Sequence, residues 1–172
     1  VGIQNVQKYV NMMPADKVPV ISEYGIFRST DPLVRSQTHA IYIAKVLMEY
    51  VRLGSPYIQK HCLIDWYSSG ADSLGPTQQA VIQAVKGEDA NTVTGEGTFT
   101  FFSTPSAHVF KMLNSGFGDT VVSTRFNKVP TLNNGAVALS ALAATDADSN
   151  IYVAIVNASR TESYPMTLAF EG

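Results

Sequence analysis

The sequence predicts a chain of two parts, an α/β segment over residues 1–118 and an all-β domain over residues 119–172. Two apolar, β-branched segments are separated by one long amphipathic pattern, and that order is typical of a βαβ unit with two parallel strands. After Asp119 the pattern changes to short strand-like segments with hairpin signals between them. The predicted fold class is therefore α/β followed by all-β.

The composition is that of a globular protein. Of the 172 residues, 45% are hydrophobic and 15% are charged, which is enough apolar material for a core. The net charge is -2 without a basic run, so we expect no nucleic-acid partner and no membrane partner. Cys62 is the single cysteine, which excludes an intrachain disulfide. Neither a run of transmembrane length nor a signal peptide is evident, so the expectation is a soluble protein, cytoplasmic or secreted.

The first predicted strand, Lys17 to Phe27, carries the acid Glu23 near its carboxyl end. The run is apolar and β-branched until Glu23, which is typical of a buried strand in a parallel sheet. In α/β barrels the chemistry lies at the carboxyl ends of such strands. Glu23 is therefore a candidate functional acid, and the alternative is a structural ion pair with Arg28 in the loop that follows.

Helical patterns flank this strand. An apolar stripe from Val1 to Met13 is closed by Pro14, so the chain begins inside a helical pattern, which we interpret as the sign of a cut or processed chain. A longer stripe predicts a helix from Val34 to Leu53, with Gly54 at its carboxyl cap.

The second predicted strand, Tyr57 to Tyr67, completes the βαβ unit and also ends in polar and aromatic residues. His61 and Cys62 lie inside this strand, where we expect them to pack in the core. A metal site would need a third ligand at a recognisable spacing, and the sequence offers none.

A segment rich in Gly, Ser and Thr follows over residues 69–98, and within it Gln78 to Val85 fits a short helix or a strand. Thr104 and Pro105 are an N-cap and first-turn pair, which predicts a helix from Pro105 to Asn114. The all-β part is predicted as four antiparallel strands, Thr120 to Phe126, Val137 to Ala144, Ile151 to Val156 and Tyr164 to Phe170. Four strands cannot cover both of their own faces, so we expect part of a β-sandwich.

Two parallel strands with flanking helices are too few for a closed barrel. A (β/α)8 TIM barrel repeats the strand–helix unit eight times, in typically about 250 residues. Residues 1–118 look like the last two units of such a barrel, with about six strands missing upstream. The fold expectation is the C-terminal segment of a TIM-barrel catalytic domain, followed by part of a C-terminal antiparallel β-sandwich.

The motif Pro19-Val-Ile-Ser-Glu-Tyr-Gly25 resembles the strand-seven motif of retaining glycoside hydrolases of the large TIM-barrel clan. The chain is similar in particular to the C-terminal part of the α-L-arabinofuranosidases of family 51. Three further features match in order: the helix Thr38 to Arg52, the segment Thr104 to Asn114 followed by Gly118-Asp-Thr120, and Ile151 to Asn157 followed by Arg160. The resemblance covers nearly the whole chain.

This resemblance implies that Glu23 is the catalytic nucleophile. A retaining glycosidase needs two carboxyl groups about 5–5.5 Å apart, one attacking the anomeric carbon and one protonating the leaving oxygen. In this clan the acid/base glutamate follows an asparagine, and this chain contains no Asn-Glu pair. The acid/base residue is therefore expected on an upstream segment, and Asp65 at the end of the next strand is the alternative within the chain.

Two aromatic residues are candidates for binding the substrate. Trp66 can form an aromatic wall of the sugar pocket, because sugars present apolar faces that stack on indole, and the alternative is a core position at the barrel mouth. Tyr24 adjoins the nucleophile, and together with Arg28 it is a candidate hydrogen-bond donor to an ionised Glu23. We expect no metal and no other cofactor.

The predicted function is hydrolysis of arabinose-containing plant cell-wall polysaccharide or oligosaccharide by a chain that is inactive alone. Its expected partners are this carbohydrate and the N-terminal part of the same enzyme as a second chain or missing segment, and the alternative to that second chain is self-association through the open strand edge. The alternative is a non-catalytic β-rich carbohydrate-binding or accessory module. The buried strand that ends in Glu23 favours the interpretation as an enzyme, because a binding module is not expected to contain an isolated βαβ unit.

Overall fold

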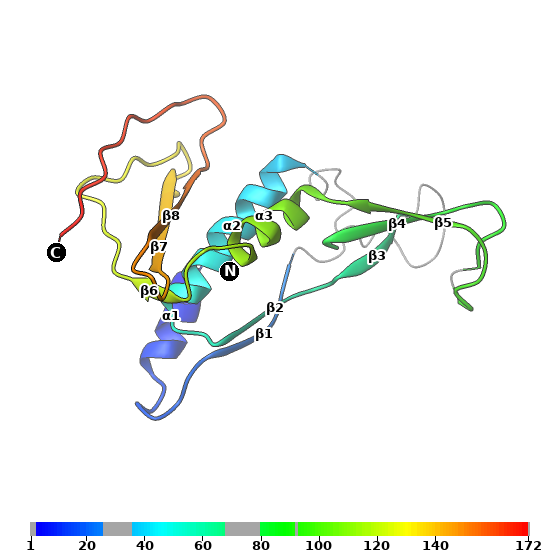
Figure 1. Ribbon diagram of the computed structural model, residues 1–172, viewed down its shortest axis with the longest axis horizontal. Helices are drawn as coiled ribbons and strands as arrows, with labels where there is room; N and C mark the ends of the chain where they lie inside the picture. Colours follow the sequence, from blue (N-terminus) through cyan, green and yellow to red (C-terminus); the bar gives the residue numbers. More distant parts are fainter. Residues whose placement is uncertain (1–2, 26–35, 68–79, 92, 172) are drawn as a thin grey trace.

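The computed structural model describes residues 3–25, 36–67, 80–91 and 93–171. Figure 1 shows an elongated arrangement in which helices α2 and α3 lie between three small sheets. In chain order the elements are α1 (Ile3–Asn11), β1 (Val20–Tyr24), α2 (Gln37–Arg52), β2 (Tyr57–Lys60), β3 (Ile64–Tyr67), β4 (Ile82–Lys86), β5 (Phe99–Ser103), α3 (Pro105–Asn114), β6 (Thr120–Val122), β7 (Leu139–Thr145) and β8 (Ile151–Asn157). The strands in the described ranges form no closed barrel, and the barrel stays a prediction.

Strands β1 and β2 form the parallel pair that a βαβ unit requires, with Val20 opposite Tyr57 and α2 as the connection. Helix α2 begins after Ser36, whose hydroxyl accepts a hydrogen bond from the backbone N–H of His39. It ends before Gly54, whose φ of 73° is a left-handed conformation that glycine adopts without strain. The predicted crossover helix is therefore confirmed.

Helix α2 supplies the centre of the core. It packs against α3, β7, β8 and β2, and its buried residues are His39, Ala40, Ile43, Ala44 and Met48. The hydroxyl of Ser106, in the first turn of α3, lies 3.3 Å from Nδ1 of His39, and both side chains are buried. A polar contact between two buried side chains therefore joins the two helices. None of the helices in the described ranges is both long and apolar enough to cross a membrane.

The predicted second strand is divided in the structure into β2 and β3, so the prediction of one continuous strand is wrong. Between them the carbonyl groups of Cys62 and Leu63 accept hydrogen bonds from the N–H groups of Val81 and Ile82. These bonds draw the chain into a second sheet, in which β3 is parallel to β4 and β4 is antiparallel to β5. The change of partner ends the first strand after Lys60.

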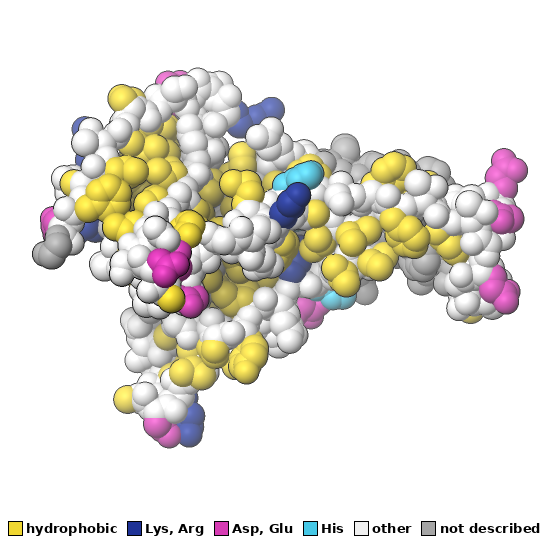
Figure 2. Space-filling model, viewed as in Figure 1, with side chains coloured by type: hydrophobic (Ala, Val, Ile, Leu, Met, Phe, Trp, Pro, Cys, Tyr) yellow, Lys and Arg dark blue, Asp and Glu magenta, His cyan; other side chains and the backbone are white. Residues whose placement is uncertain are grey.

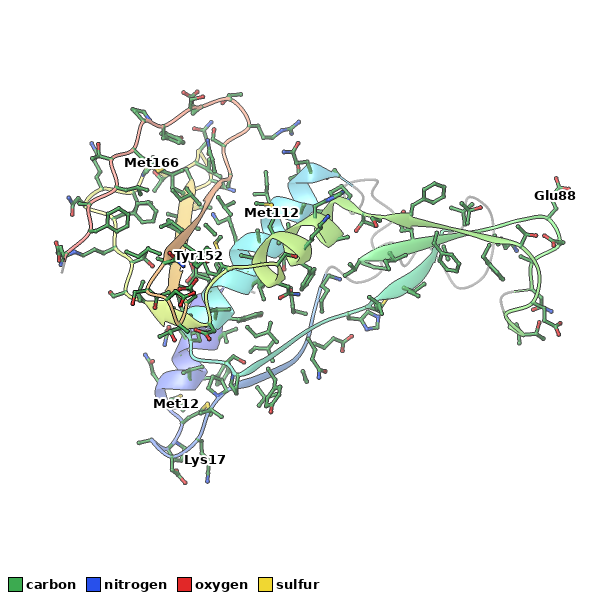
Figure 3. The ribbon with its side chains drawn as sticks, in the orientation of Figure 1. Met12, Lys17, Glu88, Met112, Tyr152 and Met166 are labelled. Carbon is green, nitrogen blue, oxygen red and sulfur yellow. The ribbon has the colours of Figure 1, made fainter. Side chains whose placement is uncertain are left out.

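Strands β4 and β5 form a hairpin that projects away from the two central helices (Figure 1). The segment Gln78 to Val85 fitted either a helix or a strand, and its described part contributes to strand β4. Glu88 lies near the far end of the hairpin (Figure 3).

The all-β part is antiparallel, as predicted, with β7 between β6 and β8. A Cβ atom on Gly118 would lie 2.4 Å from the carbonyl oxygen of Thr145, so this close approach requires glycine. The predicted fourth strand, Tyr164 to Phe170, is wrong. Its apolar residues Met166 and Phe170 are exposed, and no strand in the described ranges pairs with the segment. An alternating pattern forms no strand where no ladder partner is present.

Large apolar side chains are exposed on the β1–β2 pair and on the segment before it, and Figure 2 shows apolar side chains over several parts of one face of the molecule. Val18 is 61% exposed, Val20 57% and Tyr57 65%. The prediction that the first strand is fully buried is wrong for the part of the chain that the structure describes. There β2 is the only strand that pairs with β1, so one edge of β1 has no ladder.

Candidate active site

Glu23 is the penultimate residue of β1, at the carboxyl end of the parallel pair. The pairing is irregular here: Ile21 lies opposite Ile58 and Tyr24 opposite Lys60, so three steps along β1 span two along β2. An irregularity of this kind changes the direction in which a side chain leaves the strand. The side chain of Glu23 is 46% exposed, so a solute can reach its carboxylate.

His61 follows β2 and reaches Glu23 from the neighbouring strand. Its backbone N–H donates a hydrogen bond of 3.0 Å to the carbonyl of Tyr24, which continues the pairing of the strands past Lys60. Its side chain places Nδ1 2.7 Å from Oε1 of Glu23. The two strand ends are therefore joined by a side-chain contact at ion-pair distance, in which the imidazole is charged only when it is protonated.

Tyr24 is buried, in contrast to the half-exposed Glu23 that precedes it. Its side chain is 5% exposed, and its ring packs edge-on against Tyr50 of α2, with 5.7 Å between ring centroids. The phenolic oxygen has no hydrogen-bond partner among the described residues, and burial raises the pKa of this phenol. In this arrangement the ring of Tyr24 anchors β1 to α2.

Trp66 and Asp65 lie in β3, opposite Ala84 and Gln83 of β4, and therefore in a different sheet from Glu23. The positions of the two side chains belong to the part that the structure does not describe, and so does the whole of Arg28. The structure thus brings together Glu23 and His61, and it places the backbone of the predicted sugar-stacking residue in the adjoining sheet.

Sequence reasoning assigned His61 to the core, and this assignment is wrong, because its side chain is 43% exposed and contacts Glu23. The signal that could have found it is the register of β1 against β2. A histidine in the residue after β2 stands beside the carboxyl end of β1 only if Tyr24 pairs with Lys60, and the sequence does not reveal that pairing.

No group of three or more His, Cys, Asp or Glu side chains that could hold a metal ion is found in the described ranges. The described site offers one accessible carboxylate beside an imidazole. Comparison of the chain with family models, with curated proteins and with solved structures found no match.

Proposed function

We propose that this chain is the C-terminal portion of a retaining glycoside hydrolase, an α-L-arabinofuranosidase that acts on arabinose-containing polysaccharides of the plant cell wall, with Glu23 as nucleophile. The observation that carries the proposal is the place of Glu23 at the carboxyl end of β1 in a parallel β–α–β unit, with an accessible carboxylate 2.7 Å from Nδ1 of His61. Carboxyl ends of parallel strands are where α/β barrels place catalytic groups.

The proposed reaction has two steps. In the first, a lone pair of the Glu23 carboxylate forms a bond to the anomeric carbon, the bond from that carbon to the leaving oxygen breaks, and an acid/base carboxyl protonates this oxygen. In the second, water attacks the same carbon, its proton passes to the acid/base carboxylate, and the ester bond to Glu23 breaks. One glycosidic bond and one water thus become two hydroxyl groups, and the carboxylate is regenerated.

The acid/base residue belongs, in this proposal, to a segment upstream of the chain. The absence of an Asn-Glu pair supports this placement, and so do the open edge of β1 and the exposed apolar side chains near it, since Val20 in β1 is 57% exposed and Val18 before it is 61% exposed. An uncovered, apolar strand edge pairs readily with another strand. The N-terminal part of the same enzyme is the partner that would supply both the covering strand and the second carboxyl.

The test is Glu23→Ala in the full-length enzyme. Loss of the nucleophile should lower turnover of an aryl arabinofuranoside by several orders of magnitude, and added azide should restore part of it by attacking from the vacated space. Glu88→Ala is the matched control, because Glu88 is an exposed acid near the far end of the β4–β5 hairpin. Turnover by Glu23→Ala equal to that of the control would end the proposal.

A further inference from the structure

The contact between His61 and Glu23 is fixed by the backbone on both sides. The N–H of His61 is hydrogen-bonded to the carbonyl of Tyr24, the residue after Glu23. The ring of Tyr24 is buried against Tyr50 of α2, which holds the end of β1 in place. The 2.7 Å separation therefore joins two side chains on paired backbones and is unlike a contact between two long, freely rotating surface side chains.

We infer that His61 is a positioning residue for the nucleophile, and this inference rests on the proposed function. Nδ1 of His61 contacts Oε1 of Glu23 at 2.7 Å, and this contact orients the plane of the carboxylate. The other oxygen, Oε2, then attacks the anomeric carbon. In this role His61 exchanges no proton with substrate.

The two steps of the reaction place different demands on this contact. When the ester forms, the carboxylate loses its negative charge, and when water cleaves the ester, the charge returns to Glu23. A hydrogen bond to an ionised acceptor is roughly twice as strong as one to a neutral acceptor. His61 should therefore lower the barrier of the second step, in which the charge develops, more than the barrier of the first.

The experiment compares His61→Ala with His61→Asn in the full-length enzyme, with a dinitrophenyl arabinofuranoside as substrate. Its leaving group needs no protonation, so cleavage of the glycosyl-enzyme ester limits turnover. Removal of a donor to developing charge costs on the order of 100-fold in kcat. We expect His61→Ala to lower kcat by roughly that factor while kcat/KM, which reports the first step, changes by less than about 3-fold. Asn carries an N–H near the place of Nδ1, and it should restore kcat to within about 10-fold of the wild-type value.

His108→Ala is the control for loss of an imidazole at an exposed position, on α3, and it should leave both parameters unchanged. Equal losses in kcat and kcat/KM for His61→Ala, or identical values for the Ala and Asn variants, would overturn the inference and assign His61 a structural role. Failure of the wild-type enzyme to cleave the substrate would overturn the proposed function, and the inference with it. The wild-type measurement therefore separates the two failures.

Discussion

Nδ1 of His61 lies 2.7 Å from Oε1 of Glu23, although Glu23 in β1 and His61 directly after β2 are separated in sequence by the whole of α2. The contact exists because Tyr24 pairs with Lys60, which brings the residue after β2 beside the end of β1. A slip of one residue in this register would turn the side chains of a strand to the other face. The geometry of the candidate site is therefore set by the packing of the β–α–β unit.

Substitution of Met48 tests whether α2 packs at the centre of the core that holds the β–α–β unit. Its side chain is 2% exposed on α2, the helix that also packs against α3, β7 and β8. Met48→Ala should lower the free energy of unfolding by about 2–5 kcal/mol, because it removes buried methylene groups and leaves a cavity. Denaturant unfolding measures the change.

Met112→Ala is the matched control, since Met112 on α3 is 75% exposed (Figure 3). It should change the free energy of unfolding by less than about 0.5 kcal/mol. Similar values for the two variants would contradict the placement of α2 at the centre of the core.

The turn between β7 and β8 gives a prediction about pH. Hydrogen bonds from the side chains of Asn150 and Tyr152 to the carboxylate of Asp146 lower the pKa of this group from 3.8 to about 2. A carboxyl whose pKa is lower in the folded state contributes stability that is complete above its unfolded pKa and is lost as the pH falls towards its folded pKa. This contribution should therefore be constant near neutral pH and disappear between pH values of about 4 and 2.

The measurement is the denaturation midpoint of Asp146→Asn against wild type across that range. The variant should be less stable at neutral pH, and the difference should shrink as the pH falls. Asp148→Asn is the control in the same turn, because the side chain of Asp148 accepts no hydrogen bond among the described residues. A difference for Asp146→Asn that is independent of pH would contradict the hydrogen bonding of this turn.

The exposed edge at β1 predicts self-association of the 172-residue chain when it is isolated. Val20 is 57% exposed on a strand that has one partner in the described ranges. Val20→Lys should reduce association, because a charged side chain on an edge strand opposes pairing with another chain. Sedimentation measures the mean mass against the monomer mass of 18.6 kDa.

Val93→Lys is the control, because Val93 is 92% exposed outside the named strands. It should associate as the unmodified chain does. An unmodified chain that stays monomeric at every concentration tested would remove this support for a partner strand at β1.

Local signals in the sequence predicted the helices well. Thr104 and Pro105 marked the start of α3 at the residue where the structure begins it, and Gly54 marked the end of α2. Pro105 and Gly54 act locally, through the fixed φ of proline and the left-handed φ of glycine, whereas the hydroxyl of Thr104 donates hydrogen bonds to the carbonyls of Ala80 and Val81 and does not cap the helix. The structure also confirms the parallel relation of β1 and β2, which follows from the long helix between them.

Features that depend on distant partners could not be predicted in the same way. The division of the second strand arises from hydrogen bonds that Cys62 and Leu63 accept from residues near β4, about 20 positions later. The contact of His61 with Glu23 depends on the register between two strands. The segment Tyr164 to Phe170 has the alternation of a strand, but in the described part of the chain it has no ladder to join.

Mass spectrometry of a trapped enzyme shows directly whether Glu23 forms the covalent intermediate. The full-length enzyme is incubated with a 2-deoxy-2-fluoro-arabinofuranosyl fluoride, whose fluorine slows the second step so that the ester accumulates. If Glu23 is the nucleophile, one sugar per chain should be attached to the peptide that contains Glu23, and the Glu23→Ala variant should carry no label. Label on another residue, or full turnover of substrate with no trapped ester, would contradict it.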